Sequence, residues 1–270
     1  MLNPSLFFDL EGLNFASLFD DDRNVWEVLP AIKNYINDRI QPNVSAVRAA
    51  GEVLSRTHVL WQGQVLTENL DLQPGDAAKG AFKVFHNGEE LSGATVLYAG
   101  AALMDDRIEL GAGVVVEPGA LIKGPTIIGK NSEVRQGAYL RGSCLVGRRC
   151  IVGHVTEMKN AVMLDDAKAG HFAYLGDSIL GRNVNLGAGT KLANLKIVSR
   201  PIKIRTDGDT YTVDFRKFGA ILGDDVETGC NSVTSPGVVM GKRCLVAPCI
   251  TVPGGYHPAK SVIRGPKLVR

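Results

Sequence analysis

Apolar side chains recur at every sixth position over much of the chain. The series is unbroken from Leu110 to Leu164, continues after two one-residue slips from Ala169 to Leu192, and resumes from Leu222 to Val252. We place the first slip between Leu164 and Ala169. A spacing of six fits neither an α-helix nor a single alternating strand, but it fits short strands joined by tight turns, three to a coil. The pattern therefore predicts an all-β solenoid whose apolar residues point inward.

Residues 193–221 interrupt this spacing. Their segment IKIRTDGDTYTVDF alternates around Asp207-Gly208, which predicts a β-hairpin inserted into the solenoid.

The first 92 residues follow other patterns. Apolar residues recur at helical spacing in residues 25–40, which predicts a helix. Residues 51–109 alternate as strands do, with a turn at Asn87-Gly88. We therefore expect a small mixed α/β region, 1–92, that caps the solenoid or is accessory to it, and a solenoid domain, 93–270, with the insert 193–221.

Composition narrows the function classes. The net charge is only +2 and aromatic residues make up 6% of the chain, so we expect no nucleic-acid partner. No apolar run reaches 18 residues, and the N-terminus lacks a basic region, so we expect neither a membrane span nor a signal peptide. The five cysteines form no C-x-x-C pair. They predict reduced thiols in a cytoplasmic protein.

Three cations share one position of successive coils. Lys123, Arg141 and Lys159 each follow an inward apolar residue and lie eighteen apart, so they should stack about 4.8 Å from one another. Like charges this close repel unless an anion or a carboxylate lies among them. The column predicts either a phosphate site or a solvated basic ridge.

His154 and His171 also share a position, one coil apart once the first slip is counted. The H-x-x-x-x-H spacing of the zinc-binding proteins with this kind of fold is absent, so we expect no metal. The residue types alone leave His171 open as either a structural or a catalytic histidine.

The segment EMKNAVMLDDAKAGHFAYLGDSILGRNVNLGAGTKLAN, residues 157–194, resembles the acetyltransferase domain of the bacterial bifunctional N-acetylglucosamine-1-phosphate uridylyltransferase/glucosamine-1-phosphate acetyltransferases. It resembles even more closely the archaeal sugar-1-phosphate nucleotidylyltransferases with a similar tail. Residues 110–265 share the resemblance, which implies a left-handed parallel β-helix of hexapeptide repeats. The chain has no G-G-x-G-T-R-like loop, so we do not expect uridylyl transfer.

The resemblance also implies roles for individual residues. His171 would be the general base and Asn194 would lie at the acetyl-transfer centre. The remaining roles are sugar-phosphate binding by Arg141 and Lys159, sugar contacts by Tyr174 and Asn185, and coenzyme A contacts by Cys230, Ala247 and Arg264. The basic residue that the family has after the asparagine would be Lys196, Arg200 or Lys203. Glu157 would orient a donor.

The function implied is acetyl-CoA-dependent N-acetylation of an amino-sugar 1-phosphate, by a homotrimer. Two alternatives remain: a different or nucleotide-linked amino sugar as the acceptor, or a non-catalytic assembly or regulatory module.

Overall fold

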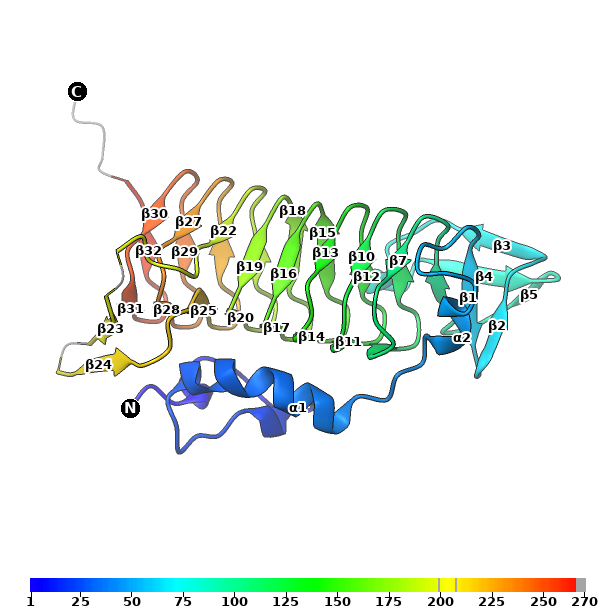
Figure 1. Cartoon of the computed structure of the whole chain (residues 1–270). Coiled ribbons are helices and arrows are strands. Elements are labelled where there is room, and N and C mark those ends of the chain that lie inside the picture. Colours follow the sequence, from blue (N-terminus) through cyan, green and yellow to red (C-terminus); the bar gives the residue numbers. More distant parts are fainter. Residues whose placement is uncertain (199, 207, 266–270) are drawn as a thin grey trace, which may run out of the picture.

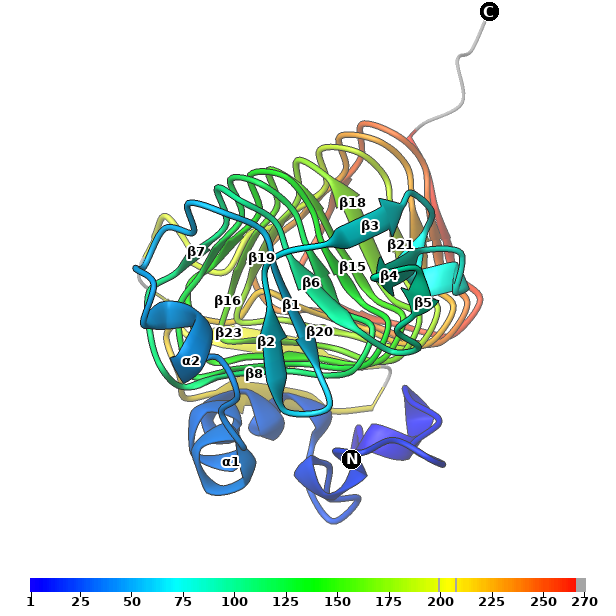
Figure 2. The ribbon, with the colours of Figure 1, turned by 90° about the vertical axis from the view of Figure 1, so that its right-hand side faces the viewer.

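The structure is a computed structural model, and it describes residues 1–198, 200–206 and 208–265. Short parallel strands wind into a three-sided solenoid with one strand per wall in each coil (Figure 1). Two of its walls have eight strands each, which gives eight complete coils among the described residues. From the β6 end, the chain turns counterclockwise as it recedes, so the helix is left-handed (Figure 2). The solenoid prediction is confirmed.

The three walls are named here in the order in which the chain visits them. Wall 1 contains, in the order of the sheet, β2 (Gln64–Leu66), β1 (His58–Trp61), β6 (Thr95–Leu97), β9 (Val115–Val116), β12 (Glu133–Val134), β15 (Ile151–His154), β18 (Lys168–His171), β21 (Asn185–Leu186), β26 (Glu227–Thr228), β29 (Leu245–Val246) and β32 (Val262–Ile263). Wall 2 contains β7 (Ala102–Leu103), β10 (Leu121–Ile122), β13 (Tyr139–Leu140), β16 (Glu157–Lys159), β19 (Tyr174–Gly176), β22 (Lys191–Leu192), β27 (Val233–Thr234) and β30 (Thr251–Val252). Wall 3 contains β8 (Ile108–Leu110), β11 (Thr126–Ile128), β14 (Cys144–Val146), β17 (Ala161–Met163), β20 (Ile179–Leu180), β25 (Ala220–Leu222), β28 (Val238–Met240) and β31 (Gly255–His257).

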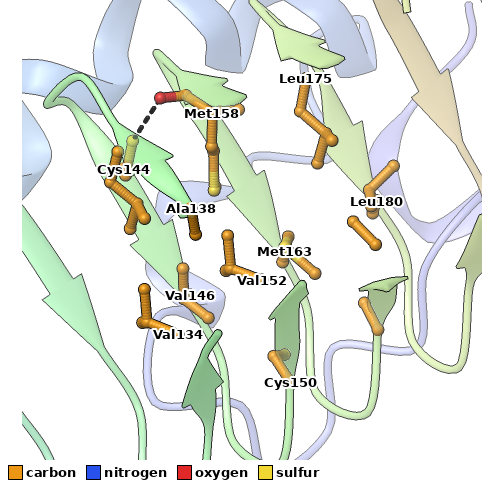
Figure 3. Close-up of a cluster of buried hydrophobic side chains, with 14 of the residues drawn as sticks. Val134, Ala138, Cys144, Val146, Cys150, Val152, Met158, Met163, Leu175 and Leu180 are labelled. Atoms are coloured by element: carbon orange, nitrogen blue, oxygen red, sulfur yellow. Dashed lines mark hydrogen bonds between the residues drawn. The ribbon is translucent and has the colours of Figure 1, made fainter. Parts of the chain in front are cut away.

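The interior of the solenoid is filled by the residues of the sixfold series. Val134 and Val152 on wall 1 and Val146 on wall 3 point inward and are fully or almost fully buried (Figure 3). One assignment in the series was wrong. Val146 pairs with Met163 across wall 3, and Met163 points into the interior, whereas Leu164 packs against the N-terminal segment outside. The first slip therefore precedes Met163.

The N-terminal segment lies along the outside of wall 3 (Figures 1 and 2). Its elements are η1 (Pro4–Leu6), η2 (Ala16–Leu18), η3 (Val25–Ala31) and α1 (Ile32–Arg39). The single helix that we predicted for residues 25–40 is instead a 3₁₀ helix followed by an α-helix. Pro30 lies in the first part, where it lacks the amide donor that an α-helical turn requires.

The next residues lead into the solenoid. After α2 (Ser45–Arg48), strands β1 and β2 extend wall 1 by antiparallel pairing, and β1 pairs with β6. Strands β3 (Leu70–Gln73), β4 (Lys83–His86) and β5 (Glu89–Glu90) form a separate sheet, with η4 (Ala77–Lys79) between β3 and β4. The turn at Asn87-Gly88 joins β4 to β5 and is confirmed, whereas the domain boundary near residue 92 stays a prediction.

The insert forms the predicted hairpin, with β23 (Ile202–Arg205) and β24 (Thr210–Val213) antiparallel. Asp207, which we placed in its turn, lies outside the described residues. Ile202, Ile204 and Val213 are buried in the same cluster as the N-terminal segment. The insert therefore packs against that segment.

Candidate functional site

His171 lies at the corner where the chain passes from wall 1 to wall 2. It is the last residue of β18 and is in register with His154, the last residue of β15. The two imidazole rings stack, with 5.5 Å between their centroids and 23° between their planes. His171 is exposed, and its backbone carbonyl accepts a hydrogen bond from the amide of Gly189 on the next coil. The predicted stacking of the two histidines is therefore confirmed, with the His171 ring facing solvent.

The cation column forms on the adjacent wall 2. Register pairs Leu121 with Tyr139 and Tyr139 with Glu157, which brings Lys123, Arg141 and Lys159 to the same position of three successive coils. The ammonium group of Lys123 lies 5.5 Å from the ring centre of Tyr139. The stacking predicted from the spacing is thus confirmed.

Two of these cations already have carboxylate partners. Arg141 donates to Glu157 at 2.7 Å, and both side chains are well exposed. This contact raises the pKa of the Arg141 guanidinium above its ordinary value. Lys159 lies 3.4 Å from both carboxylate oxygens of Asp177, which is buried. Carboxylates therefore relieve the repulsion within the column.

Asp177 joins several site residues. Besides Lys159, its carboxylate accepts from the amide groups of Asn160 at 3.0 Å and Asn194 at 2.5 Å. The hydroxyl of Tyr174 in turn donates to the side-chain oxygen of Asn194 at 3.4 Å. Lys159, Tyr174 and Asn194 thus form one hydrogen-bonded cluster at the end of wall 2.

Tyr174 is held as a neutral phenol in this cluster. Partial burial raises its pKa above the ordinary value, and the nearby carboxylates of Glu157 and Asp177 add to the effect. At neutral pH, its hydroxyl is therefore a hydrogen-bond donor.

Asn185 lies apart from this cluster. It is exposed on β21 in wall 1, paired with Lys168 of the strand that carries His171. It therefore lies one coil on from β18, opposite Lys168 and not opposite His171, and it does not join Tyr174 on wall 2.

The three residues assigned to coenzyme A lie along the same edge of the solenoid as His171. Cys230 follows β26 and is exposed, and its carbonyl accepts from the amide of Cys249. Ala247 follows β29, and its amide donates to Ile263, the residue before Arg264. With one strand spacing of about 4.8 Å per coil, Cys230 lies roughly 10 Å along this edge from His171, and Ala247 and Arg264 lie further on.

The insert borders two grooves. One, of about 580 Å³, is lined by Ala193, Lys196, Arg200, Lys203 and residues of β27 on wall 2. The other, of about 640 Å³, is lined by Lys196, Arg200, Lys203, Arg205 and residues 254–256. The three candidate basic residues of the insert thus face the same two grooves, next to Asn194.

Among the described residues, no three His, Cys, Asp or Glu side chains are grouped so that they could hold a metal ion. Within the same ranges, no helix is long and apolar enough to cross a membrane.

Sequence reasoning assigned no role to Asp177 or Asn160. The available signal was the acidic residue eighteen positions after Lys159, close to the length of one coil. The first slip obscured this signal. It shortens the coil to seventeen residues, so that Lys159 lies opposite Gly176 and not opposite Asp177.

The coils and their registers define a hexapeptide-repeat left-handed β-helix. Comparisons with known proteins show which proteins with such repeats the chain resembles. Residues 122–229 match the family model described as the GMPPB C-terminal domain. The chain is 36% identical over 97 residues to the bifunctional sugar-1-phosphate nucleotidylyltransferase/acetyltransferase of Sulfurisphaera tokodaii, covering 36% of this chain and 24% of that protein. It is 24% identical over 282 residues to bifunctional protein GlmU of Listeria monocytogenes, covering 90% of this chain and 57% of that protein.

The chain thus spans about a quarter of the first relative and a little over half of the second. Among solved structures, UDP-N-acetylglucosamine acyltransferase of Francisella novicida aligns over 58% of this chain and 60% of its own chain, at 15% identity and a TM-score of 0.39. This likeness is too low to indicate a function for the protein. The sequence matches confirm the resemblance to the acetyltransferase domain of GlmU and its bifunctional relatives. The β-helix is related to that domain.

Proposed function

We propose that this protein is an acetyl-CoA-dependent N-acetyltransferase that acts on an amino-sugar 1-phosphate, with His171 as its general base. The observation that carries the proposal is the placement of His171 on one edge of wall 2 and of Arg141, Lys159 and Asn194 toward the other. An acceptor lying across wall 2 would have its amine at the histidine and its phosphate at the cations.

The chemistry needs a free amine lone pair. In the proposed reaction, the amine nitrogen attacks the thioester carbonyl, a C–N bond forms, and the C–S bond breaks to release coenzyme A. Neutral His171 takes the proton that the amine loses, a contribution typically worth about 10² to 10⁴ in rate. The exposed ring of His171 is accessible to such an acceptor.

The phosphate would be held by the cation column. Arg141 supports this role because its present partner, Glu157, is exposed, and exposed ion pairs contribute little free energy. A phosphate can therefore replace the carboxylate and accept two hydrogen bonds from the guanidinium. Lys159 would add a second positive charge on the next coil.

Acetyl-CoA would lie along the edge that carries Cys230, Ala247 and Arg264. These residues continue from His171 in the direction of the solenoid axis, which suits an elongated cosubstrate whose thioester lies at the histidine. Free thiols agree with a location in the reducing cytoplasm, which we also propose.

We further propose a homotrimer with His171 near a subunit boundary. Val155 and Phe172 follow the two histidines at the corner and are 56% and 58% exposed. A neighbouring subunit covering these apolar side chains would also enclose His171.

The test is release of free thiol from acetyl-CoA, with glucosamine 1-phosphate, unphosphorylated glucosamine and a nucleotide-linked amino sugar as alternative acceptors. We expect the highest kcat/KM with the 1-phosphate, and a loss of about a hundredfold or more in His171→Ala with the fold intact. Turnover unchanged in His171→Ala would remove this residue from the mechanism. A higher kcat/KM with the nucleotide-linked sugar would show that this sugar, and not the 1-phosphate, is the acceptor. No turnover with any acceptor would favour a non-catalytic role.

A further inference from the structure

We propose that Asp177 is a positioning residue that holds Lys159 and Asn194 in the geometry that acetyl transfer requires. This inference rests on the proposed function. Asp177 is the residue after β19, at the corner between walls 2 and 3, and only 5% of it is exposed.

The carboxylate of Asp177 is the common partner of three side chains from two coils. One oxygen accepts from Asn160, the other accepts from Asn194, and both lie 3.4 Å from the ammonium group of Lys159. An ionised carboxylate has only acceptor sites, so it suits a position where every neighbour is a donor. A buried charge also needs such partners, because burial without them costs free energy. The partners of Asp177 therefore depend on its charge.

This contact also orients the side-chain amide of Asn194. Because a carboxylate cannot donate, the NH₂ group of Asn194 turns toward Asp177, and its oxygen faces the hydroxyl of Tyr174. One buried acid thus fixes a cation assigned to the phosphate and an amide assigned to the acetyl-transfer centre.

Gly176 supplies the space for this arrangement. A Cβ atom at Gly176 would lie 2.5 Å from the Tyr174 hydroxyl oxygen and 2.6 Å from the Asn194 amide nitrogen. The cluster therefore fills the room that the missing side chain leaves.

The two carboxylates that pair with the cation column differ in burial. The side chain of Glu157 is 36% exposed and that of its partner Arg141 is 42% exposed, whereas the values are 7% for Asp177 and 27% for Lys159. Glu157 can move aside when a phosphate binds. Asp177 is enclosed and remains in place, as a positioning residue must.

The test is Asp177→Asn in the full chain. Asp177 has a φ of 48°, in the left-handed region that asparagine also adopts, so the backbone is expected to stay unchanged. We expect kcat to fall by roughly 10- to 100-fold. The KM for glucosamine 1-phosphate should rise, with little change in the KM for unphosphorylated glucosamine, because only the phosphorylated acceptor uses Lys159.

The matched control is Asp165→Asn. Asp165 is equally buried and bonds to Arg148, but it lies at the corner between walls 3 and 1. We expect it to lower thermal stability while leaving the ratio of the two KM values unchanged. The same ratio in Asp177→Asn as in wild type would overturn the inference. Asp177→Glu is a second variant, which keeps the charge but moves it by one methylene. We expect its kcat and its KM for glucosamine 1-phosphate to change in the same direction as in Asp177→Asn.

A readout that needs no activity separates this inference from the proposed function. An ammonium group held by a carboxylate should react slowly with acetic anhydride, so labelling of Lys159, followed by mass spectrometry, should rise at least about threefold in Asp177→Asn. If wild type transfers no acetyl group to any acceptor, the proposed function fails, and the rise in labelling still tests whether Asp177 holds Lys159. Unchanged labelling would show that it does not.

Discussion

The imidazole rings of His154 and His171 lie one above the other on adjacent coils, 5.5 Å apart between centroids. Each histidine precedes a residue in the left-handed backbone region, Val155 with a φ of 51° and Phe172 with a φ of 52°. The corner therefore repeats its shape from coil to coil, and the side chains superimpose. An exposed histidine would otherwise sample several rotamers. Stacking on His154 restrains the ring of His171.

This restraint predicts different effects for two substitutions of His154. His154→Phe keeps an aromatic face under His171 and should leave kcat within about twofold of wild type. His154→Ala removes the stacking partner, a contact worth about 0.5–1.5 kcal/mol, and should lower kcat by about two- to tenfold. Steady-state kinetics measure both, with His257→Ala as a control at the far end of the solenoid. Equal losses in the Phe and Ala variants would contradict a role for stacking.

The cysteines should divide by burial in their reaction with iodoacetamide. Cys230 and Cys249 are exposed and should be alkylated in the native protein, whereas Cys144, Cys150 and Cys244 are buried and should not. Burial raises the pKa of the Cys144 thiol to about 12, and it raises those of Cys150 and Cys244 as well, so little thiolate forms. Peptide mass spectrometry identifies the labelled residues.

Acetyl-CoA provides a further arm of this experiment. If Cys230 lies at the cosubstrate site, saturating acetyl-CoA should slow its alkylation several-fold. Protection of Cys249 but not of Cys230 would show that acetyl-CoA binds one coil further from His171 than we propose.

The raised pKa of the buried Asp224 carboxyl should make the contribution of this residue to the free energy of unfolding depend on pH. Its carboxylate accepts from the backbone amides of Asp9 and Arg182, and burial raises its pKa above the ordinary 3.8. Because the folded-state pKa is the higher one, the native state binds more protons between the two values. The contribution of Asp224 to the free energy of unfolding therefore increases as the pH falls through the folded-state pKa toward 3.8.

Urea unfolding of wild type and Asp224→Asn over this pH range isolates that contribution. The difference between the two unfolding free energies should change with pH in the stated direction, even though carboxylates with lowered pKa, such as Asp105, make the whole protein less stable in acid. A difference that is constant with pH would show that Asp224 titrates alike in both states.

Trp26 should stabilise the insert as well as the N-terminal segment. It is buried, and its ring lies 5.5 Å from that of Tyr211 and 6.5 Å from that of Phe218. The backbone amide of Phe218 donates to the carbonyl of Asn194. Trp26→Ala should therefore lower the free energy of unfolding by about 3–5 kcal/mol and also reduce kcat.

Chemical denaturation and kinetics test these two effects, with Trp61→Ala as the control. Trp61 is only partly buried and lies on β1 at the opposite end, so it should cost less free energy and leave kcat unchanged. Full activity in folded Trp26→Ala would show that the packing of Trp26 against the insert does not affect the candidate site.

The repeat was predictable because nearly every inward position is apolar, whatever the rest of the coil contains, with the buried Thr228 and Thr234 as exceptions. The same rule explains the error at Leu164. Wall 3 is covered outside, so Met163 and Leu164 are both buried and both apolar, and spacing alone cannot tell which points inward. Only the register with Val146 decides it.

The candidate site was predictable where backbone stacking alone brings residues together, as for His154 and His171. The pairing of Lys159 with Asp177 was not, because it depends on side-chain direction and on a coil shortened by one residue. Likewise, the contact between Trp26 and Tyr211 joins segments far apart in the chain, and no local pattern encodes it.

The apolar outer face of wall 3 limits how two copies of the chain can meet. Val162, Ile179 and Ile221 on that face are already buried beneath the molecule's own first forty residues. Direct sheet-to-sheet contact between copies is thereby confined to walls 1 and 2 and the edge they share, and residues 76–78 already cover part of wall 1 at Glu133. That edge carries His171, so assembly and access of small molecules to this histidine depend on the same surface.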